Sequence, residues 1–240
     1  MKTSTRVPSD YEEHVGQSRQ YWRDMILGVN DGLVSMLLLV AGVVGGNLPV
    51  SQVLLTAVAG AVAGAISMGA GEYLATKSQE EVLTAELALE QSHIQSHRGM
   101  EMEQLRGMLA AMRLDPGDID TVAAALGRTD ATLLEAMKAL EFGVVDSERR
   151  SPFKAMWVSG STFVAGSLPS VVPFLFVDTP GLGLFWAAAL AGVGLFGVGV
   201  AKTRVTKTSP LMAGAENLAI AGFGGGIAFL VGRGVDRALG

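Results

Sequence analysis

The chain has 240 residues, of which 49% are hydrophobic and only 17% charged, and its formal net charge is −5. Soluble domains carry about 25% charged residues, so the composition favours a membrane protein. The acidic balance, without a basic stripe interleaved with aromatics, argues against nucleic-acid binding. Because the chain contains no cysteine, disulfides, thiolate metal sites and cysteine nucleophiles are excluded.

Five apolar segments reach the roughly 20 residues that a spanning helix requires. They cover residues 25–46, 52–75, 153–177, 181–201 and 211–232, whereas charges gather in 1–24 and 76–154. We therefore predict an all-α polytopic membrane protein with five transmembrane helices. Its predicted parts are an N-terminal segment (1–24), transmembrane helices 1 and 2 (25–75), a helical metal-binding domain (76–152) and transmembrane helices 3 to 5 (153–240).

The distribution of basic residues predicts the orientation of these spans. Nine lysines and arginines lie between Lys77 and Lys154, and others precede the first span or separate the fourth from the fifth. With five spans these segments share one side, and the short loops on the other side contain no basic residue. Since positive residues favour the cytoplasmic side, we expect the N-terminus and residues 76–152 to be cytoplasmic.

Small residues recur four positions apart within the spans. Such pairs allow helices in lipid to approach closely, and they indicate tight packing or dimerisation without deciding between the two. The pairs are Gly42/Gly46, Gly60/Gly64 and Gly222/Gly226.

The first two spans form a hairpin that turns near Pro49 and places acidic residues at membrane depth. In a regular hairpin, Asp31 lies level with Met68, while Glu72 follows one turn further along the same face and Ser35 lies one turn beyond Asp31. A charge at this depth is costly and marks an ion path. Carboxylates with a thioether can bind Fe(II) or Mn(II), and carboxylates can also carry protons.

Structural roles are the alternative for these residues. Asp31 would hydrogen-bond a helix end, Met68 would fill the core, as methionine often does, and Glu72 would reach the headgroup layer. Glu216 in the fifth span fits a path role and an interhelical polar contact equally well.

Residues 76–150 are polar with helical periodicity, which predicts a helix over 78–112, a turn at 115–117 and helices over 118–126 and 131–142, with Asp118 and Asp130 as N-caps. Acids and imidazoles on one helix stripe, completed by a second helix, are typical of metal sites in helical bundles. A solvated charged face is the alternative, and Gly99 could interrupt the stripe. The stripe consists of Glu86, Glu90, His93, His97, Glu101 and Gln104, with Met137 and Glu141 as the second set.

Two long motifs resemble the vacuolar iron transporter family: YWRDMILGVNDGLVS at 21–35 and GAISMGAGEY at 64–73. The resemblance implies a five-span homodimer that exports ferrous iron, and often manganese, from the cytosol by proton exchange. It also implies a path between the two first spans of the dimer. The path residues of the family match Asp31, Met68 and Glu72.

The family's cytoplasmic metal ligands match Glu90 and His93, Glu101 and Gln104, Met137 and Lys138, and Glu141. Three positions depart, because His93 and Gln104 replace glutamates and Lys138 replaces a methionine. We expect weaker binding of hard cations or a preference for softer ones.

The leading hypothesis is thus a metal transporter in the lipid bilayer, not an enzyme, that moves Fe(II) or Mn(II) and holds no permanent cofactor. Facilitated diffusion fits as well as proton antiport. A non-transporting membrane metal sensor or scaffold is the alternative, whereas an intramembrane hydrolase is disfavoured because the spans contain no histidine. We expect a bacterial plasma membrane, or a vacuolar membrane if the source is eukaryotic.

Overall fold

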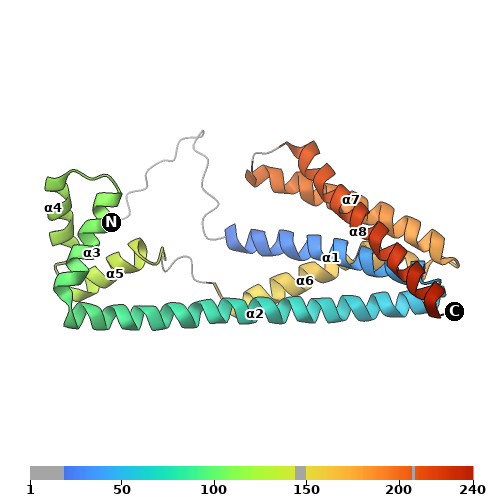
Figure 1. Cartoon of the computed structure of the whole chain (residues 1–240), viewed down its shortest axis with the longest axis horizontal. Helices are drawn as coiled ribbons and strands as arrows, with labels where there is room; N and C mark the ends of the chain where they lie inside the picture. The colour runs from blue at the N-terminus through green and yellow to red at the C-terminus, as the bar shows by residue number, and fades with distance from the viewer. Residues whose placement is uncertain (1–18, 144–149, 207–208, 240) are drawn as a thin grey trace, which may run out of the picture. The chain divides into compact units, whose positions relative to one another are not determined.

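The computed structural model describes residues 19–143, 150–206 and 209–239, and every regular element in this part of the chain is a helix (Figure 1). Within these described ranges, five helices are long and apolar enough to cross a membrane, as predicted. These are α1, α2, α6 with the 3-10 turn η3, α7 and α8. The elements are α1 (Arg19–Gly45), α2 (Val50–Ser96), α3 (Arg98–Ala111), α4 (Pro116–Leu126), α5 (Asp130–Leu140), α6 (Pro152–Val171), η3 (Val172–Leu175), α7 (Pro180–Thr206) and α8 (Pro210–Leu239).

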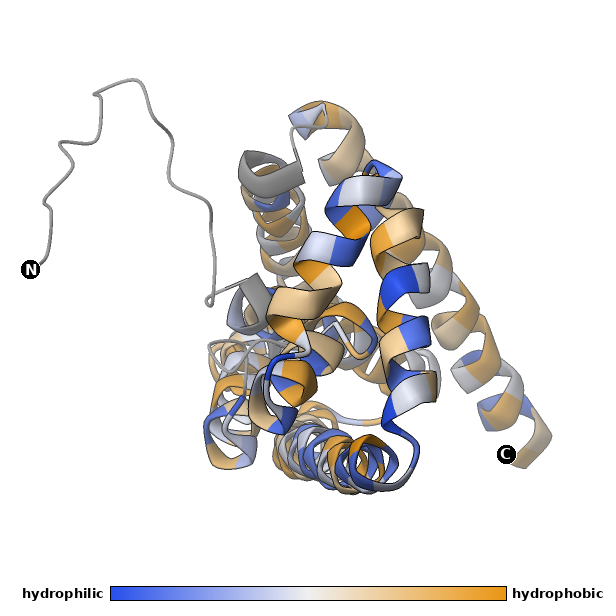
Figure 2. Cartoon of the chain, turned by 90° about the vertical axis from the view of Figure 1, so that its left-hand side faces the viewer, coloured by the Kyte–Doolittle hydropathy of each residue, from blue (hydrophilic) through white to orange (hydrophobic). Residues whose placement is uncertain are grey.

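The chain divides into two compact units. The first unit comprises Met1–Gly69 and Trp157–Gly240, and the second comprises Ala70–Met156. In the second unit, α3, α4 and α5 carry both hydrophilic and hydrophobic residues (Figure 2), as helices do when one face is buried and the other is solvated.

Helix α2 runs without interruption through the end of its predicted span. Its 47 residues correspond to about 70 Å at 1.5 Å per residue, more than twice the roughly 30 Å of a hydrocarbon core. Helix α2 is thus longer than a single span requires, and the predicted end of the span at residue 75 stays a prediction. The predicted helix start at Ser78 is wrong, because no glycine or proline between Glu72 and Ser96 breaks the backbone.

The predicted single helix over 78–112 is also wrong, because it is broken at His97. His97 has φ −134° and ψ 34°, so α2 ends at Ser96 and α3 begins at Arg98. The break precedes Gly99, the residue suspected from the sequence. Ile94 of α2 and Leu105 of α3, on either side of this break, are both buried in one apolar core.

The ends of α4 and α5 refine the predicted caps. Thr129, not Asp130, caps α5 through a reciprocal capping box with Thr132. Helix α4 begins at Pro116 with Asp115 at the N-cap position, two residues before the predicted start. The fixed backbone angle of proline suits the first helical position, which explains the earlier start.

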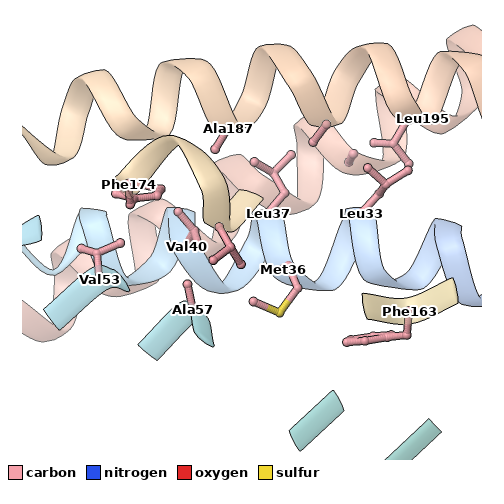
Figure 3. Close-up of a cluster of buried hydrophobic side chains, with 13 residues drawn as sticks. Leu33, Met36, Leu37, Val40, Val53, Ala57, Phe163, Phe174, Ala187 and Leu195 are labelled. Atoms are coloured by element: carbon pink, nitrogen blue, oxygen red, sulfur yellow. The ribbon is translucent and has the colours of Figure 1, made fainter. Parts of the chain in front are cut away.

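The core of the first unit forms around α1. Leu33, Leu37 and Val40 of α1 are nearly fully buried and lie opposite Ala187 and Leu195 of α7 (Figure 3). Other members of this core come from α2, α6 and η3 (Figure 3). Helix α1 is consequently packed on several sides, which positions the polar residues that it carries.

Glycines permit close backbone contacts between the membrane helices. A Cβ atom at Gly166 of α6 would overlap the carbonyl oxygen of Val29, and one at Gly32 would overlap that of Phe163. Gly42 and Gly60 also face other helices, whereas Gly222 and Gly226 have no described atom within 4 Å of a built Cβ. The predicted small-residue pairs thus include both packed and open positions.

We predict that Gly166→Ala destabilises the protein by about 1–3 kcal/mol, the usual cost of overpacking. Gly197→Ala is the matched control, because no described atom lies within 4 Å of a Cβ built at this position. Its effect should be neutral or stabilising by up to about 1 kcal/mol, the helix propensity difference. Thermal unfolding in detergent measures the stability of both variants. Equal stability of the two would contradict the close contact between α1 and α6 at Gly166.

Candidate metal sites

The α1–α2 hairpin opens toward the start of α1, where α6 packs against both helices. Near the turn, Gly60 of α2 faces Leu39 of α1, in agreement with the predicted hairpin register. Further along, the ring of Phe163 lies against Gly64 of α2, and its carbonyl oxygen lies against Gly32 of α1. Helix α6 therefore lies beside the part of the hairpin in which Asp31 and Met68 are predicted to face each other. Sequence analysis did not predict this third helix at the site.

Polar atoms around Asp31 are only partly satisfied. Ser35 donates a hydrogen bond to the main-chain carbonyl of Asp31, so its hydroxyl is engaged with the backbone. The Oδ1 atom of Asn30 is buried without a hydrogen-bond partner among the described residues. Buried polar atoms are normally paired, so Asn30 joins Asp31 as a candidate ligand. The signal in the sequence was the Asn-Asp-Gly run itself.

Met68 is half-buried and packs against the core of the first unit. This contact is what a packing role requires. The predicted role of its sulfur as a metal ligand stays a prediction.

Glu72 makes an ion pair that sequence analysis did not anticipate. Its Oε1 atom lies 3.0 Å from Nη2 of Arg150, and the two side chains are only 17% and 9% exposed, respectively. The alternative in which Glu72 reaches the headgroup layer stays open, because this contact does not give its depth in a membrane. Glu72 is a compensated carboxylate, one helical turn from Met68 on α2.

Glu216 on α8 is exposed. A polar contact between α7 and α8 comes from its neighbour Asn217. The Asn217 side-chain amide donates a hydrogen bond to the carbonyl oxygen of Leu195, with 3.2 Å between Nδ2 and this oxygen. The two interpretations of Glu216 thus gain no support from this interhelical hydrogen bond.

In the second unit, the break at His97 gathers three of the predicted ligands. Glu90 and His93 of α2 and Glu101 of α3 each offer a ligand atom, and these atoms lie within 4.8 Å of one another. His93 Nδ1 is 3.7 Å from Glu101 Oε1. The predicted one-helix stripe is wrong, because the chain turns at His97, and the three residues meet across this turn.

The two carboxylates of this cluster are buried with unsatisfied oxygens. Glu90 and Glu101 are 5% and 6% exposed, and Glu90 Oε1 and Glu101 Oε2 lack hydrogen-bond partners in the described chain. Burial, followed by repulsion from Glu101 and Glu141, raises the pKa of Glu90 to about 7. Two carboxylates and an imidazole are a suitable donor set for a divalent transition metal.

The other predicted ligands surround this cluster at different distances. His97 is exposed, its Nδ1 lies 2.9 Å from the Ser96 hydroxyl, and its ring centre is 6.4 Å from that of His93. Glu141 is exposed but close enough to influence the pKa of Glu90.

For three other predicted ligands the structure gives burial or surface neighbours, and their role as ligands stays a prediction. Met137 is fully buried in the apolar core of the second unit, and Gln104 is exposed. Glu86 lines a surface pocket with Phe142 and Val82. Lys138, the unusual cation, is buried and lies 3.4 Å from Glu135 Oε2, which offsets part of its charge.

The five long apolar helices and the buried acidic residues define a polytopic helical membrane protein. Its sequence matches the VIT family over residues 22–233. The chain therefore belongs to the VIT family, and the resemblance inferred from the two motifs is confirmed.

Relatives support the same assignment along most of the chain. Vacuolar iron transporter 1 of Tulipa gesneriana is 29% identical over 98% of this chain and 95% of its own length. Vacuolar iron transporter 2 of Oryza sativa subsp. japonica is 30% identical over 89% of this chain and 87% of its own length. Protein CCC1 of Saccharomyces cerevisiae is 28% identical over 78% of this chain and 58% of its own length.

The raised pKa of Glu90 predicts a pH dependence of stability in protein freed of metal by a chelator. The folded state holds this proton more tightly than the unfolded state, in which the pKa is near 4.5. The free energy of unfolding should therefore fall as pH rises from 4.5 to about 7. Glu90→Gln should reduce this decline in denaturant titrations, whereas a decline identical to wild type would contradict it.

Glu101→Gln should weaken Mn(II) binding and at the same time stabilise the metal-free protein. The substitution removes one ligand charge and also removes its repulsion with Glu90. Glu103→Gln is the matched control, because Glu103 lies on the same helix and is exposed. Thermal unfolding with and without Mn(II) measures both effects. An unchanged metal-induced shift in Glu101→Gln would exclude Glu101 as a ligand.

Proposed function

We propose that this protein exports Fe(II), Mn(II) or both from the cytosol across its membrane. The observation that carries the proposal is the cluster of Glu90, His93 and Glu101, whose ligand atoms lie within 4.8 Å of one another in a chain with five candidate membrane helices. A metal-binding group and spanning helices are the two parts that a metal transporter needs. The names of the relatives, vacuolar iron transporters of tulip and rice, favour iron as the ion.

The proposed path through the membrane uses Asp31, Met68 and Glu72, with Ser35 and Asn30 near its first carboxylate. A charged side chain at membrane depth is retained when it serves an ion or a proton. Asp31 lies on a helix that is packed on several sides, so its position is fixed. In this proposal the metal moves along α1 and α2, and protons moving the opposite way over the same carboxylates drive export.

The proposed cytoplasmic site captures metal before it enters the path. Glu90, His93 and Glu101 form its centre, Glu141 adds charge, and His97 is close enough to join after a small movement. The imidazole favours borderline transition metals over Mg(II) and Ca(II).

A homodimer with the N-terminus and the second unit in the cytoplasm completes the proposal. Gly222 and Gly226 of α8, which face open space in the single chain, support a contact with another helix. A bacterial plasma membrane remains our expectation for the location, with a vacuolar membrane as the eukaryotic counterpart.

The second candidate is a metal sensor that does not transport. The break at His97 favours it, because metal binding across α2 and α3 would change the angle between these helices. The two functions differ in one respect, since only a transporter moves metal into a closed vesicle.

Asp31→Asn should abolish metal transport, because it removes the path charge while retaining side-chain size. Purified protein in liposomes that contain a metal-sensitive dye should take up Fe(II) or Mn(II), and the variant should fall to the level of protein-free liposomes. Asp178→Asn, in the loop between η3 and α7, is the matched control and should transport normally. Absence of uptake by the wild type, with metal binding retained, would favour the sensor.

A further inference from the structure

The ion pair between Glu72 and Arg150 lies at the junction of α2 and α6. Arg150 is 78 positions from Glu72 along the chain and lies two residues before α6, outside any helix. Beside the pair, the rings of Tyr73 and Phe153 are 5.1 Å apart. This junction is therefore held by a charge contact and by an aromatic contact.

The pair occupies a place where a transported ion would need a free carboxylate. Glu72 lies one helical turn from Met68 on α2, and both belong to the proposed path, so this inference rests on the proposed function. A cation that binds Glu72 must compete with the guanidinium for the same oxygen atoms. Arginine remains charged under all ordinary conditions, so it can yield the carboxylate only by moving away.

A cation that belongs to the protein, such as Arg150, can also limit how tightly an ion path holds its ion. An ion must bind favourably enough to enter but weakly enough to leave, and a bare carboxylate buried at this depth would hold a divalent ion too tightly. Since Arg150 precedes α6, it can move away from Glu72 without breaking the hydrogen bonds of a helix. The aromatic contact between Tyr73 and Phe153 can hold the junction during this movement.

We propose that Arg150 is an internal counter-cation of the transport path, which neutralises Glu72 at rest and exchanges with the metal ion during transport. Arg150 is thus a positioning residue that sets the affinity of Glu72 for the ion. Its charge, rather than its contribution to folding, is the essential property.

The kinetics of Mn(II) uptake by proteoliposomes test this role. Arg150→Gln should lower KM by roughly five- to tenfold, the lower range of coupling between two binding events, and should lower kcat because release slows. Arg150→Lys, which keeps the cation, should retain the wild-type KM. Arg106→Gln is the matched control, because Arg106 pairs with acids on the exposed surface of the second unit, and its KM should not change.

A double variant connects the effect to Glu72. With Glu72→Gln present, adding Arg150→Gln should change KM no further, because the carboxylate that the arginine neutralises is gone. An unchanged KM in Arg150→Gln, or an equal fall in KM with and without Glu72, would overturn the inference while leaving transport intact. A wild-type protein that moves no metal would overturn the proposed function instead.

Hydrogen exchange of the wild-type protein provides a test that does not depend on the folding of any variant. Saturating Mn(II) should accelerate exchange in residues 151–156, because the tie between Arg150 and Glu72 is released, whereas Mg(II) should not. The acceleration should be lost in Glu72→Gln. Equal exchange with Mn(II) and Mg(II) in the wild type would overturn the proposed displacement.

Discussion

The cost of removing a carboxylate from water governs the polar architecture of this protein. A buried charge requires a partner, and loss of that partner is strongly destabilising. Asp24 is 1% exposed, and Arg23 Nη2 lies 3.3 Å from its Oδ1 atom, while Glu72 is held by Arg150. These two acids are compensated by arginines within the chain, whereas Glu90 and Glu101 share their site with the imidazole of His93. The second unit thus contains the acids most in need of an added cation.

Close helix packing determines where these charges can lie. Gly32 and Gly166 bring the backbones of α1 and α6 together, so α6 occupies the space beside the α1–α2 hairpin. Since the helices of a membrane protein gain little from the hydrophobic effect within lipid, such small-residue contacts provide much of their association.

The five spans could be predicted because their signal is strong and local: about 20 apolar residues with few charges. The family could also be predicted, because both motifs are long and ordered. The break at His97 could not, since helical periodicity continues across it and no proline or glycine stands at that position. Arg150 was missed for the same reason, because its partner lies 78 positions away and no local pattern connects them.

The crowding of acids around Glu90 also explains why a histidine suits the proposed cytoplasmic site. Glu90 already experiences burial together with repulsion from Glu101 and Glu141, and its pKa is raised to about 7 as a result. A carboxylate in place of His93 would add a further negative charge, because His93 Nδ1 lies 3.7 Å from Glu101 Oε1. A neutral imidazole offers a ligand atom without this repulsion, and a protonated one attracts both acids. The metal-free fold is thereby relieved of a charge that only a bound ion could balance. The same exchange reduces the total ligand charge, so the ion must gain from nitrogen coordination what it loses in electrostatic attraction. If the proposed site binds metal, that balance would favour Fe(II) or Mn(II) over Mg(II) and Ca(II), which bind oxygen ligands almost exclusively.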